Sequence, residues 1–120
     1  MNIKIIVNPH AGEGRARNVG FSVEKFLCER CIEYSLDSTY RPGGATALAK
    51  KATQNGFNLI IAVGGDGTVN EVANGMIGTG SSLAIIPSGK KNDLARAIGL
   101  PLNSINDACQ IALAATSLNM

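Results

Sequence analysis

The residues best suited to chemistry lie in one short stretch, Gly64-Gly65-Asp66-Gly67-Thr68. Three glycines around one acidic residue leave the backbone bare. They permit positive φ angles and allow a ligand to approach without meeting a Cβ atom. A helix that starts directly behind such a turn presents unpaired N–H groups and the positive end of its dipole. Phosphate is the ligand that this arrangement favours, and a purely structural strand-to-helix turn is the alternative.

The sequence on both sides of the glycines predicts the elements that hold them. An apolar, β-branched run at residues 59–63 predicts a strand, and a helical pattern runs to about residue 76. Thr68 and Glu71 have the spacing of a capping box, in which each side chain bonds the other residue's backbone amide. We therefore expect the helix to begin at Thr68. The common nucleotide signatures GxxxxGK[ST] and GxGxxG do not describe this turn.

The whole chain alternates strand and helix patterns four times, which is typical of βαβ crossovers and a parallel sheet. The expected strands cover residues 3–7, 32–38, 59–63 and 83–86, and the expected helices cover about 16–30, 45–55, 68–76, 92–98 and 104–116. Four loops therefore follow strands at one edge of the sheet, where open α/β sheets bind ligands. The predicted fold is a three-layer α/β/α, Rossmann-like domain with a mostly parallel sheet.

The length and composition of the chain agree with a single α/β domain. The 120 residues are 45% hydrophobic but only 4% aromatic, with 14 glycines, which indicates an aliphatic core and many tight turns. The net charge of +2 is too small to argue for a nucleic-acid partner. No apolar run is long enough to span a membrane and no signal-peptide layout is seen, so we expect a cytoplasmic protein.

The other polar candidates are less specific. Arg15 and Arg17 either bind phosphate or lie in solvent at the start of a helix, and His10 is expected to be a surface side chain. Cys28 and Cys31 have redox or zinc spacing but no second such pair, so we expect ordinary semi-buried thiols on one side of a helix. A metal or redox role is the alternative.

Three motifs in the same order and spacing point to a family. The segment GGDGTVNEVANG, with VNPHAG at residues 7–12 and IPSGKKNDLAR at residues 86–96, resembles the diacylglycerol kinase catalytic domain. This family includes bacterial lipid kinases and sphingosine kinases, and TYRPGGA at residues 39–45 is similar to a fourth motif. GGDGT is shared with NAD kinases, whereas the Asn-Pro and Asn-Asp-x-Ala-Arg segments favour a lipid kinase. The resemblance covers nearly the whole chain.

The resemblance implies that residues 1–120 are the N-terminal nucleotide-binding domain of an ATP-dependent lipid kinase of phospholipid metabolism. Such an enzyme uses ATP with Mg²⁺ and phosphorylates the hydroxyl of diacylglycerol or a related lipid at the membrane surface. Asp66 is then the candidate catalytic or magnesium-linked carboxylate. The residues expected to contact the nucleotide are Asn8, Thr39, Gly64, Gly65, Asp66, Gly67, Thr68, Asn70, Glu71, Gly89 and Lys90.

Two departures from the family pattern keep other functions open. Lys90 replaces the threonine that usually follows Gly89, and it either binds a phosphate as a point charge or disrupts the site. Family members also continue into a β-rich domain that supplies much of the lipid site, metal-binding acidic residues and the catalytic base, and this chain stops before it. A non-catalytic nucleotide-binding module and an NAD-kinase-like enzyme are the alternatives. A homodimer and peripheral membrane contact remain open.

Overall fold

Four parallel strands form the central sheet, in the order β2-β1-β3-β4. The computed structural model describes residues 2–87, whose elements are β1 (Ile3–Val7), α1 (Arg15–Glu29), β2 (Tyr34–Ser38), α2 (Gly44–Gln54), β3 (Leu59–Gly64), α3 (Asp66–Gly75) and β4 (Ser82–Pro87). The predicted parallel α/β fold is confirmed. The helices expected at residues 92–98 and 104–116 lie outside the described residues.

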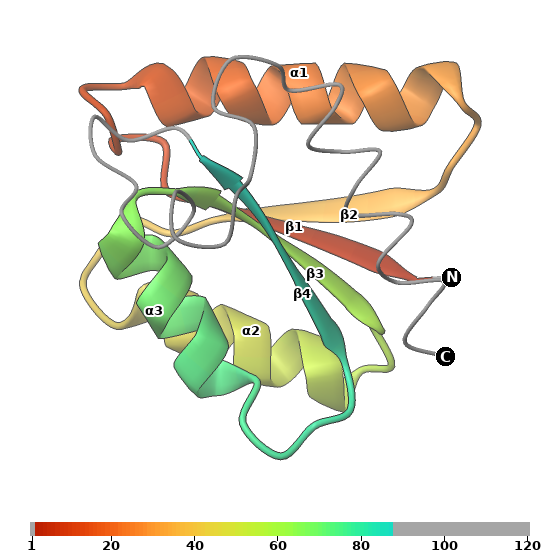
Figure 1. Ribbon diagram of the computed structural model, residues 1–120, viewed down its shortest axis with the longest axis vertical. Coiled ribbons are helices and arrows are strands. Elements are labelled where there is room, and N and C mark those ends of the chain that lie inside the picture. Colours follow the sequence, from red (N-terminus) through yellow and green to blue (C-terminus); the bar gives the residue numbers. More distant parts are fainter. Residues whose placement is uncertain (1, 88–120) are drawn as a thin grey trace.

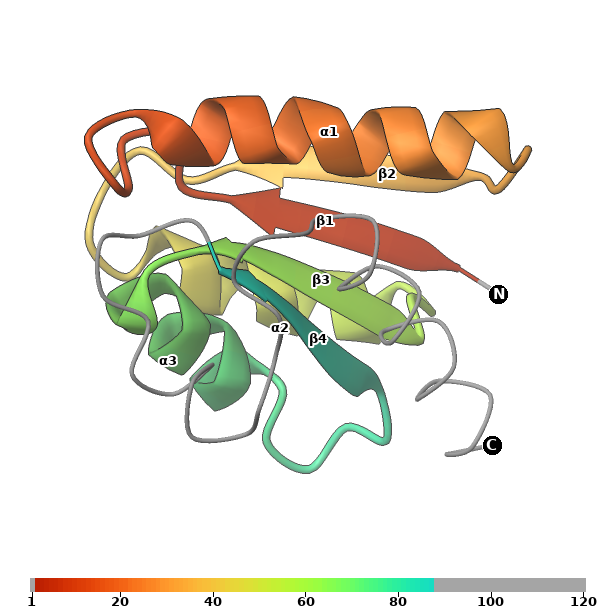
Figure 2. The same cartoon turned by 45° about the horizontal axis from the view of Figure 1, so that its top comes forward.

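The strand order contains a switch point between β1 and β3. The connection through α1 leads from β1 to β2 on one side, and the connection through α2 then returns across β1 to β3 on the other. Helix α1 accordingly covers one face of the sheet, while α2 and α3 cover the opposite face (Figures 1 and 2). A change of face is what a single handedness requires when the direction of strand addition reverses. The loops that leave β1 and β3 therefore diverge, and a crevice opens between them.

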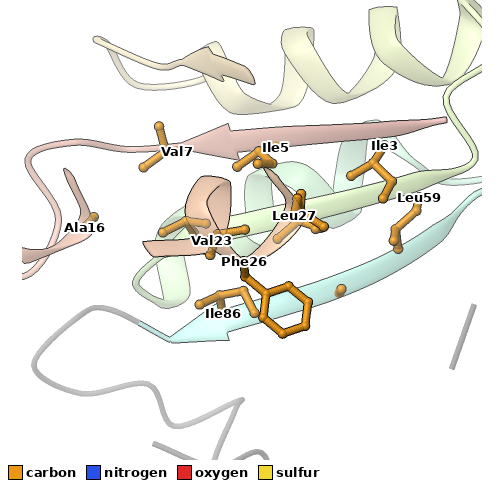
Figure 3. Close-up of a cluster of buried hydrophobic side chains, with 12 residues drawn as sticks. Ile3, Ile5, Val7, Ala16, Val23, Phe26, Leu27, Leu59 and Ile86 are labelled. Carbon is orange, nitrogen blue, oxygen red and sulfur yellow. The ribbon is translucent and has the colours of Figure 1, made fainter. Parts of the chain in front are cut away.

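The two central strands are buried on both faces, which explains their continuous apolar runs. Ile5 and Val63 face α1, whereas Ile6 and Ile60 face α2 and α3, and each is less than 1% exposed. Figure 3 shows the cluster on the α1 side, where Phe26 lies beside the β4 residue Ile86. The edge strand β2 is half-buried throughout, in agreement with its alternating sequence.

One charged side chain interrupts the core. Lys4 lies in the middle of β1 and is only 9% exposed. Its ammonium donates hydrogen bonds to Asp37 Oδ2 at 2.9 Å and to Ser35 Oγ at 3.1 Å, both on β2. The ion pair compensates for removing the charge from water, because a buried charge without a partner is costly.

The second strand begins two residues later than predicted, because residues 31 and 32 complete the end of α1. Ile32 N–H donates to Leu27 O at 2.9 Å and Cys31 N–H donates to Cys28 O at 3.0 Å, which is the Schellman motif. Cys31 takes the left-handed conformation that this motif demands, with φ of 55°. The expected placement of both thiols on one helix side is therefore wrong, and both cysteines are exposed.

Candidate functional site

Backbone hydrogen bonds tie together the carboxyl ends of three strands. Asn8 N–H, directly after β1, donates to Val63 O of β3 at 3.1 Å, and Thr39 N–H, directly after β2, donates to Val7 O at 2.9 Å. The loops that follow β1, β2 and β3 consequently leave the same edge of the sheet (Figure 1). The predicted convergence is confirmed for these three loops, and the loop after β4 lies outside the described residues.

The glycine corner between β3 and α3 is built differently from the prediction. Gly64 ends β3, Gly65 is the N-cap of α3 with φ of −89° and ψ of −170°, and Asp66 is the first helical residue. No glycine of this corner has a positive φ. The glycines of this corner are therefore not needed for a left-handed backbone conformation.

Gly64 is required by packing inside the protein. A Cβ atom on Gly64 would lie 2.6 Å from Thr68 Oγ1 and 2.7 Å from Thr68 Cβ, which is closer than such atoms approach. A Cβ atom on Gly65 or Gly67 would meet nothing within 4 Å. The described fold therefore explains the first glycine, but it contains no contact that excludes a side chain at Gly65 or Gly67.

The predicted capping box is wrong. Thr68 is the third residue of α3 and is only 6% exposed, and no side chain caps this helix. Glu71 instead caps the neighbouring helix, because its Oε1 accepts a hydrogen bond from Ala45 N–H in the first turn of α2 at 3.2 Å. Thr46 Oγ1 donates in turn to Glu71 O at 2.8 Å. The close approach of α2 and α3 places this carboxylate at the start of another helix.

A cavity of about 290 Å³ opens between helix α3 and the loops that follow β1 and β2. Four predicted site residues line it: Asn8, Thr39, Thr68 and Glu71. Their polar atoms also hold the walls in place. Asn8 Oδ1 accepts from His10 N–H at 3.1 Å, and Thr39 Oγ1 donates to Arg41 O at 3.3 Å. The two loops that line the cavity are thus held in place by their own side chains, and Thr68 and Glu71 line it from α3.

The sequence did not single out several residues of this cavity. Its remaining lining residues are His10, Tyr40, Arg41 and Pro42. His10 is exposed, as predicted, yet it lies at the cavity wall. All four lie within four residues of the end of β1 or β2. Their closeness in the sequence to the carboxyl end of a predicted strand is therefore the signal that could have identified them.

Basic side chains differ in their relation to the cavity. Arg41 lines it and also lines an adjacent cavity of about 490 Å³ that contains Lys51. Arg15 is exposed and lines neither of these cavities, while Arg17 lines a third, smaller cavity next to Tyr40. Arg41 is therefore the described cation best placed for an anionic ligand at the carboxyl edge.

The other predicted site residues within residues 2–87 do not line this cavity. Asp66 is half-buried in the first turn of α3, and Asn70 is exposed on the same helix. Within residues 2–87, no group of three or more metal-ligating side chains is brought together. A magnesium ion beside Asp66 would therefore need most of its oxygen ligands from a bound phosphate or from water, as this ion usually does. Gly89 and Lys90 lie outside the described residues.

Comparison with known proteins gives consistent matches. Residues 2–120 match the family described as diacylglycerol kinase catalytic domain. Diacylglycerol kinase of Bacillus subtilis (strain 168) is 40% identical over 113 residues, which cover 92% of this chain and 37% of the relative. Diacylglycerol kinase of Staphylococcus haemolyticus (strain JCSC1435) is 40% identical over 100 residues, which cover 82% of this chain and 30% of the relative.

The fold agrees with these sequence matches. A crystal structure of a diacylglycerol kinase from Bacillus anthracis str. Sterne superposes with a TM-score of 0.79 at 33% identity. The match covers 94% of this chain and 42% of that chain. This chain therefore spans less than half the length of the relatives that it matches.

Proposed function

From the premise that this chain belongs to the diacylglycerol kinase catalytic domain family, we propose that it is the nucleotide-binding part of an ATP-dependent lipid kinase. The whole enzyme would transfer the γ-phosphate of ATP to the hydroxyl of diacylglycerol or a related lipid. The lipid's oxygen forms the new bond to phosphorus, ADP leaves, and the hydroxyl proton is released. The names of the relatives support diacylglycerol as the acceptor.

The observation that carries this proposal is the bare corner at the start of α3. Gly67 lies in the first turn of a helix, where alanine is normally more favourable by about 0.5–1 kcal/mol. A Cβ atom at Gly67 or Gly65 would project into open space. Backbone amides in a helix's first turn have no intrahelical acceptor, and they attract phosphate. Contact with a bound polyphosphate would explain why both positions are glycine, which the packing of the described fold does not explain.

The cavity walls offer complementary groups for the rest of the nucleotide. The Arg41 guanidinium would neutralise phosphate charge, and the side-chain N–H groups of Asn8 would donate to the ligand while its oxygen holds His10. Thr39 would present its hydroxyl oxygen, and Thr68 its hydroxyl or amide group, from buried positions. Together these residues bind and orient ATP, which is most of what phosphoryl transfer asks of a protein.

Asp66 is proposed as the catalytic or magnesium-binding carboxylate beside the phosphate that is transferred. It lies next to the bare backbone, in the turn that would contact the phosphates. Asp66 would be the protein ligand of a magnesium ion, which would supply positive charge to neutralise the phosphates. Exposed Asn70 would contribute a polar contact at the rim.

The proposal extends to Gly89 and Lys90 in the loop after β4. An ammonium at position 90 would bind a phosphate as a point charge in place of a threonine hydroxyl. Replacing Lys90→Thr should then weaken the binding of ATP, measured by calorimetry. Tighter binding by the threonine variant would reject this role. We propose that the enzyme reaches the lipid through peripheral contact with a membrane. No helix in residues 2–87 is long and apolar enough to cross one.

The decisive experiment separates binding from folding at one atom. Gly67→Ala should raise the free energy of unfolding by about 0.5–1 kcal/mol, because alanine favours the helix and its Cβ meets nothing. The same variant should bind Mg·ATP at least about tenfold more weakly, which corresponds to about 1.4 kcal/mol, because the methyl group occupies the phosphate position. Titration calorimetry measures binding, and urea denaturation measures stability.

Asn74→Ala provides the matched control, because Asn74 is exposed at the far end of the same helix. It should leave the affinity for Mg·ATP unchanged. If folded wild-type chain shows no heat of binding for Mg·ATP, or if Gly67→Ala binds as tightly as wild type, the phosphate site is not at this corner.

A further inference from the structure

The two exposed cysteines at the end of α1 form a second feature with chemical potential, on the side of the fold away from the cavity. Cys28 lies in the last turn of the helix, and Cys31 is the residue just beyond the C-cap Arg30. Both thiols are exposed. The hydrogen bond from Cys31 N–H to Cys28 O, at 3.0 Å, closes a tight turn between them.

The backbone of this turn brings the two residues within disulfide range. A hydrogen-bonded turn holds its first and fourth Cα atoms within about 7 Å of each other. Disulfides join residues whose Cα atoms are about 4.4–6.8 Å apart. The Schellman bonds, which are already made in the described chain, hold the backbone in this turn.

Cys31 occupies a position that favours glycine. Its φ of 55° lies in the left-handed region, where a Cβ atom is unfavourable and where helix ends usually place glycine. Within residues 2–87, the exposed Cys31 thiol makes no side-chain hydrogen bond. This left-handed residue therefore carries an exposed thiol one tight turn away from a second exposed thiol.

Cys28 has one additional partner. Its Sγ lies 3.7 Å from Tyr34 Oη, and Tyr34 Oη donates to Glu24 Oε1 at 3.0 Å. Either the sulfur or the phenol oxygen can donate in this contact. A reduced sulfur offers a hydrogen and accepts better than a disulfide sulfur, so the contact with Tyr34 stabilises the dithiol form.

We propose that Cys28 and Cys31 are a thiol–disulfide modification site that reacts with low-molecular-weight disulfides. One thiolate attacks the small disulfide, forms a mixed disulfide and releases one small thiol. The second protein thiolate then attacks the bound protein sulfur and releases the other small thiol. The protein loses two hydrogen atoms and is oxidised by two electrons, and the small disulfide is reduced to two thiols. This inference does not depend on nucleotide binding.

The test uses the 120-residue chain, equilibrated in buffers of oxidised and reduced glutathione, quenched with N-ethylmaleimide and digested with trypsin. Trypsin cleaves after Lys25, Arg30 and Lys50, so the bridge would link peptide 26–30 to peptide 31–50. Mass spectrometry reports this cross-link directly, and Cys109 serves as the internal comparison. We expect the 28–31 bridge with an equilibrium constant at least about tenfold larger in the folded chain than in urea.

Each other result would overturn the proposal. Glutathione attached to Cys28 or Cys31 without the cross-linked peptide would show that the turn does not bring the sulfurs together. A bridge to Cys109 in place of the 28–31 bridge, or an equal equilibrium constant in urea, would also reject it. Tyr34→Phe should move the equilibrium further toward the disulfide, because the reduced Cys28 loses its hydrogen-bond partner. A shift toward the dithiol would contradict the proposed site.

Discussion

At the scale of single residues, Glu71 connects the candidate site to the packing of two helices. Its side chain lines the cavity and accepts the Ala45 N–H bond, while its backbone carbonyl accepts from Thr46 Oγ1. The carboxylate also lies at the positive end of the α2 dipole, where a negative charge is stabilising. Glu71 is therefore expected to act on the cavity through the position of α2.

Replacing Glu71→Ala should lower the free energy of unfolding by about 1 kcal/mol, the usual loss for a helix cap. Glu71→Gln should lose less, because its side-chain oxygen still accepts from Ala45 N–H although the charge is gone. Urea denaturation of both variants measures the difference. Equal losses for alanine and glutamine would show that the hydrogen bond contributes nothing measurable.

At the scale of elements, the contact between α2 and α3 depends on one glycine. A Cβ atom on Gly75 would collide with the carbonyl oxygen of Thr46 and lie 2.9 Å from Ala49 Cβ. The absence of a side chain allows the two helices to approach closely, and that approach is what brings Glu71 to the start of α2. Small residues on facing helices thus determine where a site residue lies.

Gly75→Ala should lower the free energy of unfolding by about 1–3 kcal/mol, because overpacking outweighs the helix propensity of alanine. Gly67→Ala is the matched control, since the same substitution in the same helix faces open space and should be stabilising. Denaturation curves for the two variants should therefore move in opposite directions. A stabilised Gly75→Ala variant would mean that α2 and α3 separate at little cost.

At the scale of the whole molecule, stability should fall in alkaline solution partly through Tyr34. The hydrogen bond with Cys28, partial burial and the Glu24 carboxylate raise the pKa of the Tyr34 phenol well above its usual range. Since the folded pKa exceeds the unfolded value of about 10, this contribution is complete below about pH 10 and declines as the pH rises further.

The measurement compares wild type with Tyr34→Phe by urea denaturation at about pH 8 and about pH 11. The wild-type chain should lose more stability than the variant across this interval, because phenylalanine has no proton to lose. Glu24→Gln tests the part contributed by the carboxylate, whose removal should reduce the pH dependence. Parallel curves for wild type and Tyr34→Phe would show that the phenol ionises equally in folded and unfolded chains.

The family position of the chain also belongs to this scale. We propose that the described domain binds the nucleotide, and the chain spans less than half the length of its relatives. Binding of Mg·ATP and transfer of phosphate to a lipid are therefore separate questions for this chain. Calorimetry with Mg·ATP answers the first, and radiolabelled transfer to diacylglycerol in mixed micelles answers the second.

The sequence by itself determined the local elements and their order. Continuous apolar runs identified β1 and β3, and glycine-rich turns after strands located the carboxyl edge where the cavity lies. These signals are local, because the burial of a strand and the conformation of a turn depend on residues that are neighbours in the sequence. The motifs also sufficed to predict the family to which the chain belongs.

Only the tertiary structure decided which distant groups meet. Glu71 has capping-box spacing for its own helix, yet it caps α2 because the helices touch at Gly75. Lys4 is a single polar residue in an apolar strand, and only the pairing of β1 with β2 brings it to its partner Asp37. Such partners lie far apart in the chain, and their choice depends on packing distances that no local pattern encodes.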